Sequence, residues 1–313
     1  MKKTVLTPTR RCFITGASAL GLAACAGQTD QIALRDPDEE AEGGISGTGI
    51  QGSGFVGTVL GFGSILINGE RVETPAGMRM ADAFGAIGLD DLKPGHSVTV
   101  QTDGLVAHHL AQHHPVIGRV DAVLGRGVVQ ILGARVLLPA GVTMIVGEHA
   151  RVSGIWDGGV VRATRVDPAA IGIASVSGTV TPTGINGVAV EGILPRPGVF
   201  ATATGTASGG VLRADAFAIG RFTNAGAPLK RISAEGYLER APLEASGFLL
   251  SGFGHSFDAA AQLTPVARGR HLFRGRYEAD FEVAEAIPLP ETEAEKRALL
   301  LSDSPFEAAI ATR

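Results

Sequence analysis

Cysteine is nearly absent from this chain of 313 residues, because only Cys12 and Cys25 occur and both lie close to the amino terminus. Everything beyond Cys25 lacks thiols, which excludes a disulfide framework, a thiolate zinc site and a cysteine nucleophile there. The sequence also contains neither a P-loop nor a G-x-S-x-G elbow. Two widespread classes of catalytic protein, the P-loop nucleotide hydrolases and the α/β-hydrolases, therefore have no support in the sequence.

An excess of positive charge is missing as well, since 27 Lys and Arg face 31 Asp and Glu. Four basic residues and no acidic ones precede Cys25, so the chain from Cys25 onward carries 23 basic and 31 acidic side chains, a net charge of about −8. Nucleic-acid binding depends on the neutralisation of phosphates, and an acidic chain argues against it. The same charge argues against electrostatic attraction to anionic lipid.

The apolar run near the amino terminus is too short to cross a membrane. Phe13–Ala24 holds only 12 residues, whereas a spanning helix needs about 20. A short apolar run behind basic residues is typical of a signal peptide, which we predict over residues 1–24. The paired Arg10 and Arg11, followed by a weakly hydrophobic run rich in Ala and Gly, resemble the twin-arginine export signal.

The predicted signal peptide ends in Leu22-Ala23-Ala24-Cys25, which resembles the lipobox of bacterial lipoproteins. The resemblance implies that Cys25 is acylated and becomes the first residue; the alternative is an ordinary cleavage site that happens to precede a cysteine. Ala26, rather than an aspartate, follows the cysteine, and this resembles the default sorting to the outer membrane. We therefore expect a periplasmic protein that a lipid anchors, most naturally in the outer membrane.

Residues 25–54 have the composition of a flexible tether, with an acidic stretch followed by the glycine-rich GGISGTGIQGSG. A coil of this length has a mean reach of about 30 Å. Gly47–Gly52 match the pattern G-x-G-x-x-G, but a nucleotide site needs a strand before the pattern and a helix after it. An acidic linker precedes it and a strand-like stretch follows, so we interpret the match as linker composition.

Aromatic residues are scarce, at 5% of the chain, while hydrophobic residues reach 45% and glycine occurs 44 times. This composition predicts cores of Val, Ile, Leu and Ala in many short strands with tight turns. Four stretches also begin alike, with glycines that are 61, 60 and 58 residues apart: Gly57, Gly118, Gly178 and Gly236. A fixed period of this kind indicates an array of one small unit.

The predicted fold class is all-β, a tandem array of about four small OB-like β-barrel units with a short C-terminal helix or tail. Closure into barrels removes the exposed strand edges that such units would otherwise carry. A β-sandwich of paired units and a solenoid are the competing architectures. The predicted segments are the signal peptide (1–24), the lipidated cysteine and tether (25–54), four barrel units (55–114, 115–170, 171–228 and 229–288) and the C-terminal helix or tail (289–313).

The stretch Gly57–Gly69, GTVLGFGSILING, resembles the opening of a bacterial family of uncharacterised small-barrel domains with the pattern G-x-V-x-x-F-G-S-I-x-V-N-G. Asp91–Gly95 matches the leucine-x-x-glycine that follows in that family, and the similarity extends from Gly54 to about Gly118. The resemblance implies OB-like barrels that often occur in tandem on exported proteins. It brings no catalytic residues to this chain. Within the motif, Asn68-Gly69 is a favoured hairpin turn.

Four of the eight histidines fall within seven residues, as His108, His109, His113 and His114. Imidazole binds zinc and copper, so convergence of two or three of these rings would make a metal site. Strand alternation predicts that His108 and Leu110 share one face and that His109 lies on the other. The alternative is a polar loop between the first and second units.

Two further features have both a binding and a structural interpretation. Trp156, the only tryptophan, is either a stacking platform for a ligand or a turn anchor, and we favour the anchor. A basic strand follows in the fourth unit, and we interpret it as a solvated face paired with nearby acidic residues rather than as a carboxylate or phosphate site. Its residues are Arg268, Arg270, His271, Arg274 and Arg276.

The sequence thus favours a non-catalytic periplasmic lipoprotein that acts as a binding or assembly module of the cell envelope, without a cofactor. Its expected partner is an unidentified envelope protein or polysaccharide. One alternative is a metal-binding envelope protein that holds zinc or copper through the histidine cluster. The other is a hydrolase of envelope polymers.

The lipobox predicts that Cys25→Ser releases the protein from the membrane fraction, because the acyl chains would have no attachment point. Arg10→Lys combined with Arg11→Lys should block export altogether. Fractionation of cells that express each variant checks both outcomes. Sedimentation of the Cys25→Ser protein with membranes in detergent-free buffer would show that the lipobox interpretation is wrong.

Overall fold

A computed structural model describes residues 52–222, 229–240, 248–254, 257–258, 269–278 and 281–302. The predicted signal peptide, Cys25 and all but the last residues of the predicted tether lie outside the described residues. Strands dominate, and the helical elements are a 3-10 turn at Leu89–Asp91 and one short helix, α1 (Glu293–Ser302). The all-β class is therefore confirmed. Among the described residues, no helix is long and apolar enough to cross a membrane.

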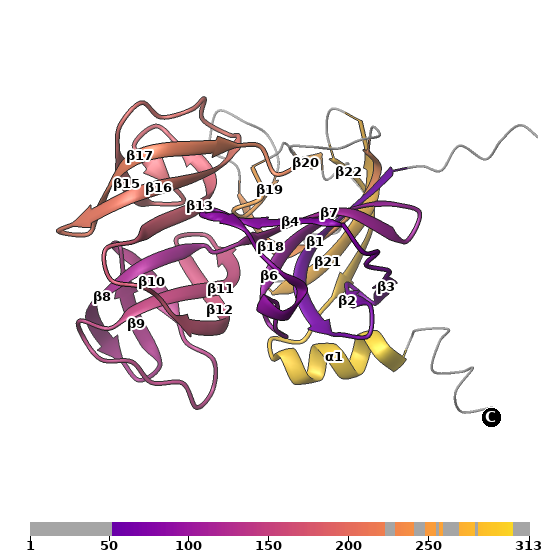
Figure 1. The fold of residues 1–313 in the computed structure, drawn as a ribbon, viewed down its shortest axis with the longest axis horizontal. Coiled ribbons are helices and arrows are strands. Elements are labelled where there is room, and N and C mark those ends of the chain that lie inside the picture. Colours follow the sequence, from indigo (N-terminus) through magenta and orange to yellow (C-terminus); the bar gives the residue numbers. More distant parts are fainter. Residues whose placement is uncertain are drawn as a thin grey trace, which may run out of the picture. The chain divides into compact units, whose positions relative to one another are not determined.

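A closed five-stranded barrel lies in the middle of the chain (Figure 1). Its strands are β8 (Val116–Gly125), β9 (Val128–Ile131), β10 (Ala134–Leu137), β11 (His149–Asp157) and β12 (Val160–Pro168). Antiparallel pairs join β8 to β9, β9 to β10, β12 to β11 and β11 back to β8, while β10 and β12 pair in parallel. The circuit leaves none of the five strands as an edge, which is the advantage that closure gives to a small β unit.

The next five strands pair in the same order. They are β13 (Ala174–Thr181), β14 (Gly184–Ile185), β15 (Val188–Glu191), β16 (Phe200–Ser208) and β17 (Val211–Ile219). The pairs β13–β14, β14–β15, β17–β16 and β16–β13 are antiparallel, and β15–β17 is parallel.

The first strand group repeats most of this pattern and adds a hairpin. Its strands are β1 (Gly52–Gly61), β2 (Ile65–Ile67), β3 (Glu70–Val72), β4 (Arg79–Asp82), β5 (Gly85–Ala86), β6 (Ser97–Asp103) and β7 (Val106–His113). Antiparallel pairs join β1 to β2, β2 to β3, β1 to β6 and β6 to β7, and a parallel bridge from Glu73 to Val106 completes the circuit. The extra hairpin β4–β5 lies beside β7.

The last strand group contains β18 (Leu229–Arg240), β19 (Phe248–Leu250), β20 (Phe257–Asp258), β21 (Arg270–Tyr277) and β22 (Phe281–Pro288). Antiparallel pairs join β18 to β19, β18 to β21 and β21 to β22, and β20 pairs with β22 in parallel.

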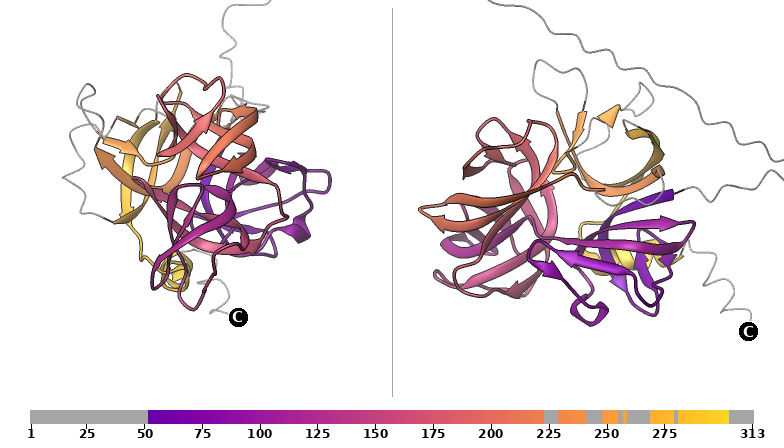
Figure 2. Two further views of the ribbon diagram at one scale, coloured as in Figure 1. Left: turned by 90° about the vertical axis from the view of Figure 1, so that its left-hand side faces the viewer. Right: turned by 45° about the horizontal axis from the view of Figure 1, so that its top comes forward.

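The first strand of each group also pairs with the first strand of one other group, so that the four groups form two pairs. β1 runs parallel to β18, and β8 runs antiparallel to β13. A 12-stranded sheet thus unites the first and last groups, and a 10-stranded sheet unites the two middle groups. In the right-hand view of Figure 2 the first and last groups lie on one side and the two middle groups on the other. The described strands therefore form neither a single continuous sheet nor a solenoid.

The glycines that mark the repeat in the sequence have a packing role. A Cβ at Gly57 would lie 2.4 Å from the Asn68 side chain, and one at Gly178 would lie 2.3 Å from that of Asn186. Both asparagines sit in hairpin turns at positive φ, each followed by a glycine at positive φ, as a type I′ turn requires. The turn side chain therefore folds back over the first strand, and only glycine leaves room for it.

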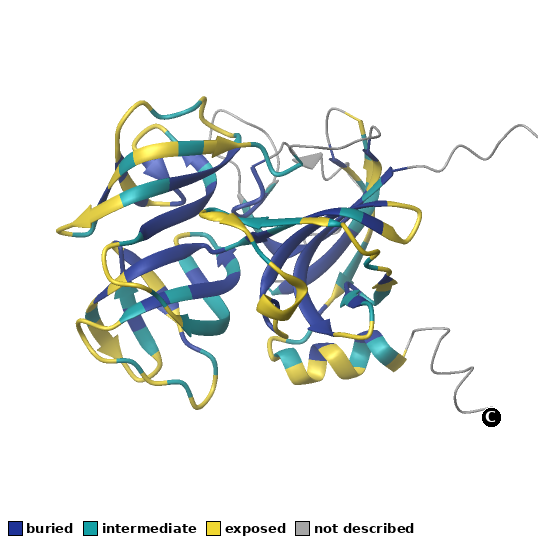
Figure 3. Ribbon diagram, in the orientation of Figure 1, coloured by how far each residue is buried: buried dark blue, intermediate teal, exposed yellow. Residues whose placement is uncertain are grey.

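Buried residues lie along the strands, and exposed residues gather at the hairpins (Figure 3). One core of mostly Val, Ile, Leu and Ala spans both middle groups, and a similar core fills the first group, as the composition predicts. The last group differs, because its core contains Phe253, Phe273 and Phe281. Val56 on the outer face of β1 belongs to this core, so the first and last groups share apolar packing as well as a strand pair.

Helix α1 is held against the paired first strands by a buried ionic network. Lys296, only 1% exposed, donates to Glu235 at 3.1 Å on β18 and also to Thr58 on β1. Arg270 on β21 pairs with Glu235 and with Glu293 at the start of the helix. Burial alone would raise the pKa of Glu235, but the charges of Arg270 and Lys296 and hydrogen bonds from Lys296 and Thr58 outweigh it and hold that pKa below its usual value. The helix is therefore an integral part of the fold.

The basic residues of β21 are paired with acids in part, but the strand is not the solvated face that we expected, because Arg270 and His271 are buried. Arg270 is buried in the network, and Arg274 lies 3.6 Å from Glu285 on β22. Arg276 stands opposite Glu282 in the register of the two strands. Arg268 lies outside the described residues.

Lys296→Met is expected to lower the free energy of unfolding by about 3 kcal/mol, because it leaves buried carboxylates without one of their cations. Chemical denaturation monitored by circular dichroism measures the change. Lys230→Met is the matched control, since the Lys230–Glu278 pair is exposed and such pairs contribute about 0–1 kcal/mol. Equal effects of the two substitutions would contradict a structural role for the network.

Candidate functional site

The structure separates the four clustered histidines. A bulge in β7 places Gln101 opposite His109 and Thr102 opposite Ala107, so that His108 is the additional residue between them. Ala107 and Leu110 consequently enter the core together. The expectation that His108 and Leu110 share a face is wrong, because the bulge shifts the alternation of the strand.

His113 and His114 lie beyond the bulge and contact different surroundings. The His113 ring meets the edge of Phe200 at 5.1 Å between centroids, whereas the His114 ring lies 6.4 Å from that of His96. The two rings line different cavities. Within the part of the chain that the structure describes, no three His, Cys, Asp or Glu side chains converge as a metal ion would require.

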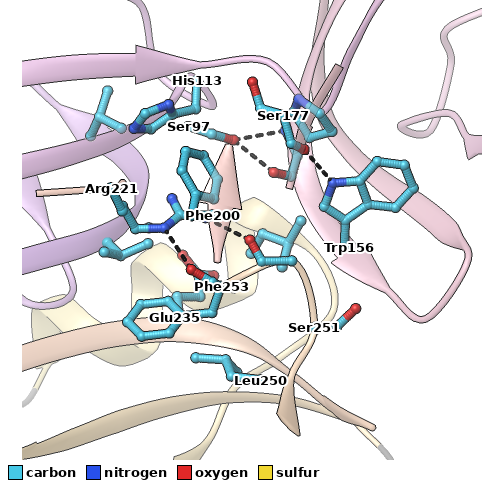
Figure 4. A pocket seen from close by; sticks show the side chains of 17 residues that line it. Ser97, His113, Trp156, Ser177, Phe200, Arg221, Glu235, Leu250, Ser251 and Phe253 are labelled. Carbon is cyan, nitrogen blue, oxygen red and sulfur yellow. Dashed lines mark hydrogen bonds between the residues drawn. The ribbon is translucent and has the colours of Figure 1, made fainter. Parts of the chain in front are cut away.

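The His113 ring faces a small cavity where all four strand groups meet (Figure 4). The cavity has a volume of about 50 Å³. Its walls include Ser97 from the first group, Trp156 from the second, Phe200 from the third and Phe253 from the last. A space of this size holds a few water molecules at most.

Arg221, which follows β17, holds this junction together. Its guanidinium lies 3.9 Å from the centroid of the Phe200 ring and donates to the carbonyl oxygen of Gly252 at 2.7 Å and to the hydroxyl of Thr99 at 3.4 Å. Burial lowers the pKa of Arg221 to about 9. Among the described residues, the guanidinium is thus held by cation–π and hydrogen-bond contacts and not by a carboxylate, and these contacts connect three of the four groups.

Trp156 belongs to the same junction as a structural anchor. It is buried, and its Nε1 donates to the backbone oxygen of Ser177 at 2.7 Å. Ser97 adds a second link, since its hydroxyl donates to the carbonyl oxygen of Gly154 and accepts from the same residue's N–H. The burial of Trp156 and its hydrogen bond to Ser177 support the anchor interpretation of the tryptophan.

A much larger polar groove of about 530 Å³ lies between the first and second strand groups. The β4–β5 hairpin and the 3-10 turn form one wall, and β11 and β12 form the other. Its lining residues are Asp82, Phe84, Gly85, Ala86, Ile87, Asp91, Lys93, His96, Gln112, His114, Arg151, Asp167 and Pro168. This volume falls in the usual range of small-molecule sites.

Two of the three carboxylates in the groove are paired with arginines, one across the groove and one within β12. Asp82 accepts from Arg151 at 2.9 Å, which ties the β4–β5 hairpin to β11. Asp167 on β12 accepts hydrogen bonds from Nε and Nη2 of Arg165 and lies 2.9 Å from Nε2 of His96. Burial would raise the pKa of Asp167, but these hydrogen bonds outweigh it and lower that pKa.

His96 is neutral in this arrangement. Its Nδ1 accepts the N–H of Lys93 at 3.1 Å, so the ring proton sits on Nε2 and points to Asp167. Burial lowers the pKa of His96. A proton on Nδ1 would also face the N–H of Lys93, so that two donors would point at each other. Both ring nitrogens are thus engaged, and His96 has no lone pair left for a metal or for proton abstraction.

Three residues of the groove have groups that a ligand could contact. Nε2 of His114 is buried and has no hydrogen-bond partner among the described residues. The amide of Gln112 lines the groove and makes no hydrogen bond to any described side chain or backbone group. The ring of Phe84 is 42% exposed at the rim, with the Arg151 guanidinium 5.4 Å from its centroid.

Sequence reasoning missed this groove, although a length signal was available. Gly95 lies 26 positions after Gly69, whereas Gly147 lies 14 positions after Gly133 and Gly198 lies 11 positions after Gly187. The added length of the first interval holds the β4–β5 hairpin and the 3-10 turn.

No protein-family model matches this chain, no curated protein matches it, and no solved structure matches it.

The buried histidines predict that the protein loses stability in mild acid. Burial lowers the pKa of His96, His109 and His113, and it lowers that of His114 to about 4. In the unfolded chain these rings take up protons near pH 6.5. The unfolded state therefore binds more protons below pH 6.5, and the free energy of unfolding falls as the pH drops from 6.5 towards 4.

His114→Gln should reduce this loss by about 2–3 kcal/mol between pH 7 and pH 4.5, since a single ring with such a shift contributes that much. Urea denaturation at both pH values measures it, and the value at pH 8 serves as the reference for each protein. A wild-type stability that stays constant from pH 7 to pH 4.5 would contradict the neutral state of these rings.

Proposed function

We propose that this protein is a non-catalytic binding module of the cell envelope, anchored through lipid on Cys25 at the periplasmic face of the outer membrane. Its body consists of four copies of one small OB-like barrel. The polar groove between the first two copies is the binding site, for an envelope protein or polysaccharide.

Equivalent hydrogen bonds support the interpretation as copies. Gly95, Gly147 and Gly198 donate to the carbonyl oxygens of Val59, Val120 and Val180, at 2.8, 3.0 and 2.8 Å. Each of these valines follows a repeat-marking glycine by two residues and donates its own N–H to the residue after the donor glycine. In the last group a Cβ at Gly236 would lie 2.5 Å from Leu250, which matches the packing of Asn68 over Gly57.

The groove carries the proposal of binding without catalysis. A general acid or base must exchange protons near the working pH. Two of its three carboxylates, Asp82 and Asp167, are instead held by arginines, and Asp91 accepts the N–H of Gly88. Both nitrogens of His96 are engaged as well. The groove therefore offers a fixed, hydrogen-bonding surface of a size that suits a ligand.

The location rests on the amino-terminal motifs. The paired arginines, the short apolar run and Leu22-Ala23-Ala24-Cys25 resemble an export signal with a lipobox. A tether with a mean reach of about 30 Å would place the barrels just clear of the membrane surface.

Reversible crosslinking in cells, followed by affinity purification from solubilised membranes, tests the proposed site. Wild-type protein should recover an envelope component. The double variant Phe84→Ala/Gln112→Ala should recover about tenfold less of the same component. Phe62→Ala is the matched control, since Phe62 is 44% exposed and lines none of the described cavities. Identical recovery with all three proteins would contradict the groove as the binding site.

A further inference from the structure

The charges of the groove constrain what it can bind. Its three acidic residues, Asp82, Asp91 and Asp167, are balanced by Lys93, Arg151 and the adjoining Arg165. Asp82 and Asp167 already have arginine partners at hydrogen-bond distance. Of these pairs, Asp82–Arg151 connects the two walls, whereas Arg165 and Asp167 both lie on β12. Asp91 and Lys93 are exposed and opposite in charge, so the groove has no excess of either sign. The groove therefore favours a ligand without net charge.

The groups that remain available are neutral hydrogen-bonding groups. Gln112 offers an amide that both donates and accepts hydrogen bonds. His114 is only 3% exposed, and its Nε2 has no hydrogen-bond partner among the described residues. Ser153 Oγ lies 3.4 Å from Nδ1 of His114 and defines its other side. A ligand rich in hydroxyl groups satisfies such a set, because each hydroxyl can donate and accept. Leaving a buried nitrogen unpaired costs about 1–3 kcal/mol, which a suitable ligand would recover.

An aromatic surface completes the set. The Phe84 ring projects from the β4–β5 hairpin, where its own N–H donates to Asp82 at 2.7 Å and so fixes the turn. Its exposed face can cover the apolar C–H face of a sugar ring, which buries apolar area on both partners. The Arg151 guanidinium close to the same ring restrains it and keeps donors beside it.

We propose that the groove between the β4–β5 hairpin and strands β11–β12 binds a neutral saccharide, about one to two sugar rings long. Phe84 supplies the stacking face, and Gln112 and His114 supply hydrogen bonds to hydroxyl or acetamido groups. This inference rests on the proposed function and specifies the ligand class of the same groove.

Isothermal titration calorimetry on the full-length protein in detergent tests the ligand class. The probes are cellobiose and N,N′-diacetylchitobiose as neutral disaccharides, digalacturonate as a charged one and trialanine as a peptide. At least one neutral disaccharide should bind, and digalacturonate and trialanine should bind about tenfold more weakly or not at all.

Variants tie that binding to the groove. Phe84→Ala and Gln112→Ala should each weaken binding of the neutral disaccharide about tenfold, while Phe62→Ala should bind like wild type. Unchanged melting temperatures establish that the variants are folded. Tighter binding of digalacturonate or trialanine, equal loss with Phe62→Ala and Phe84→Ala, or no heat from either neutral disaccharide at concentrations up to about 20 mM would each overturn the proposal.

The two proposals fail separately. Groove-dependent recovery of an envelope protein, without disaccharide binding, would uphold the binding module and overturn the saccharide. Saccharide binding that all groove variants retain would overturn the groove itself.

Discussion

The arrangement of the strand groups depends on the ion pairs and hydrogen bonds of the Glu235 carboxylate. This carboxylate accepts from Thr58 on β1, from Lys296 on α1 and from Arg270 on β21, while it sits on β18 itself. A buried carboxylate is costly unless it is paired and fully hydrogen-bonded. Those partners come from both ends of the described chain, so the carboxylate is satisfied only when the first strands of the outer groups, β21 and the helix are all in place.

The pairing of β1 with β18 has consequences at the centre of the molecule. It brings the last strand group beside the first, and the two middle groups, joined through β8 and β13, pack against them around Arg221. The link from His96 to Asp167 then sets β12 opposite the β4–β5 hairpin. The two walls of the groove belong to different strand groups, and the groove exists because those contacts fix the position of one wall relative to the other. Neither wall could form a site alone.

Sequence reasoning succeeded where one local constraint dominates. The repeat was visible because a turn side chain packs over the first strand and excludes every residue except glycine, as Asn68 does at Gly57. The strand content could be predicted from the alternation of apolar and polar residues and from the glycines in turns, because both signals depend on only a few neighbouring residues. The bulge at His108 could not be foreseen, because nothing in the local pattern indicates where β7 takes up its additional residue against β6.

The amino-acid sequence by itself determined the β class, the period near 60 residues and the amino-terminal motifs, since each depends on neighbouring residues. Only the tertiary structure decided which groups pair, that His113 and His114 face different cavities, and that Phe84, Gln112 and His114 line one groove. Charge pairs such as Asp82–Arg151 join residues 69 positions apart. No local pattern specifies such a partner, because the free energy that selects it comes from burial and packing of whole strand groups.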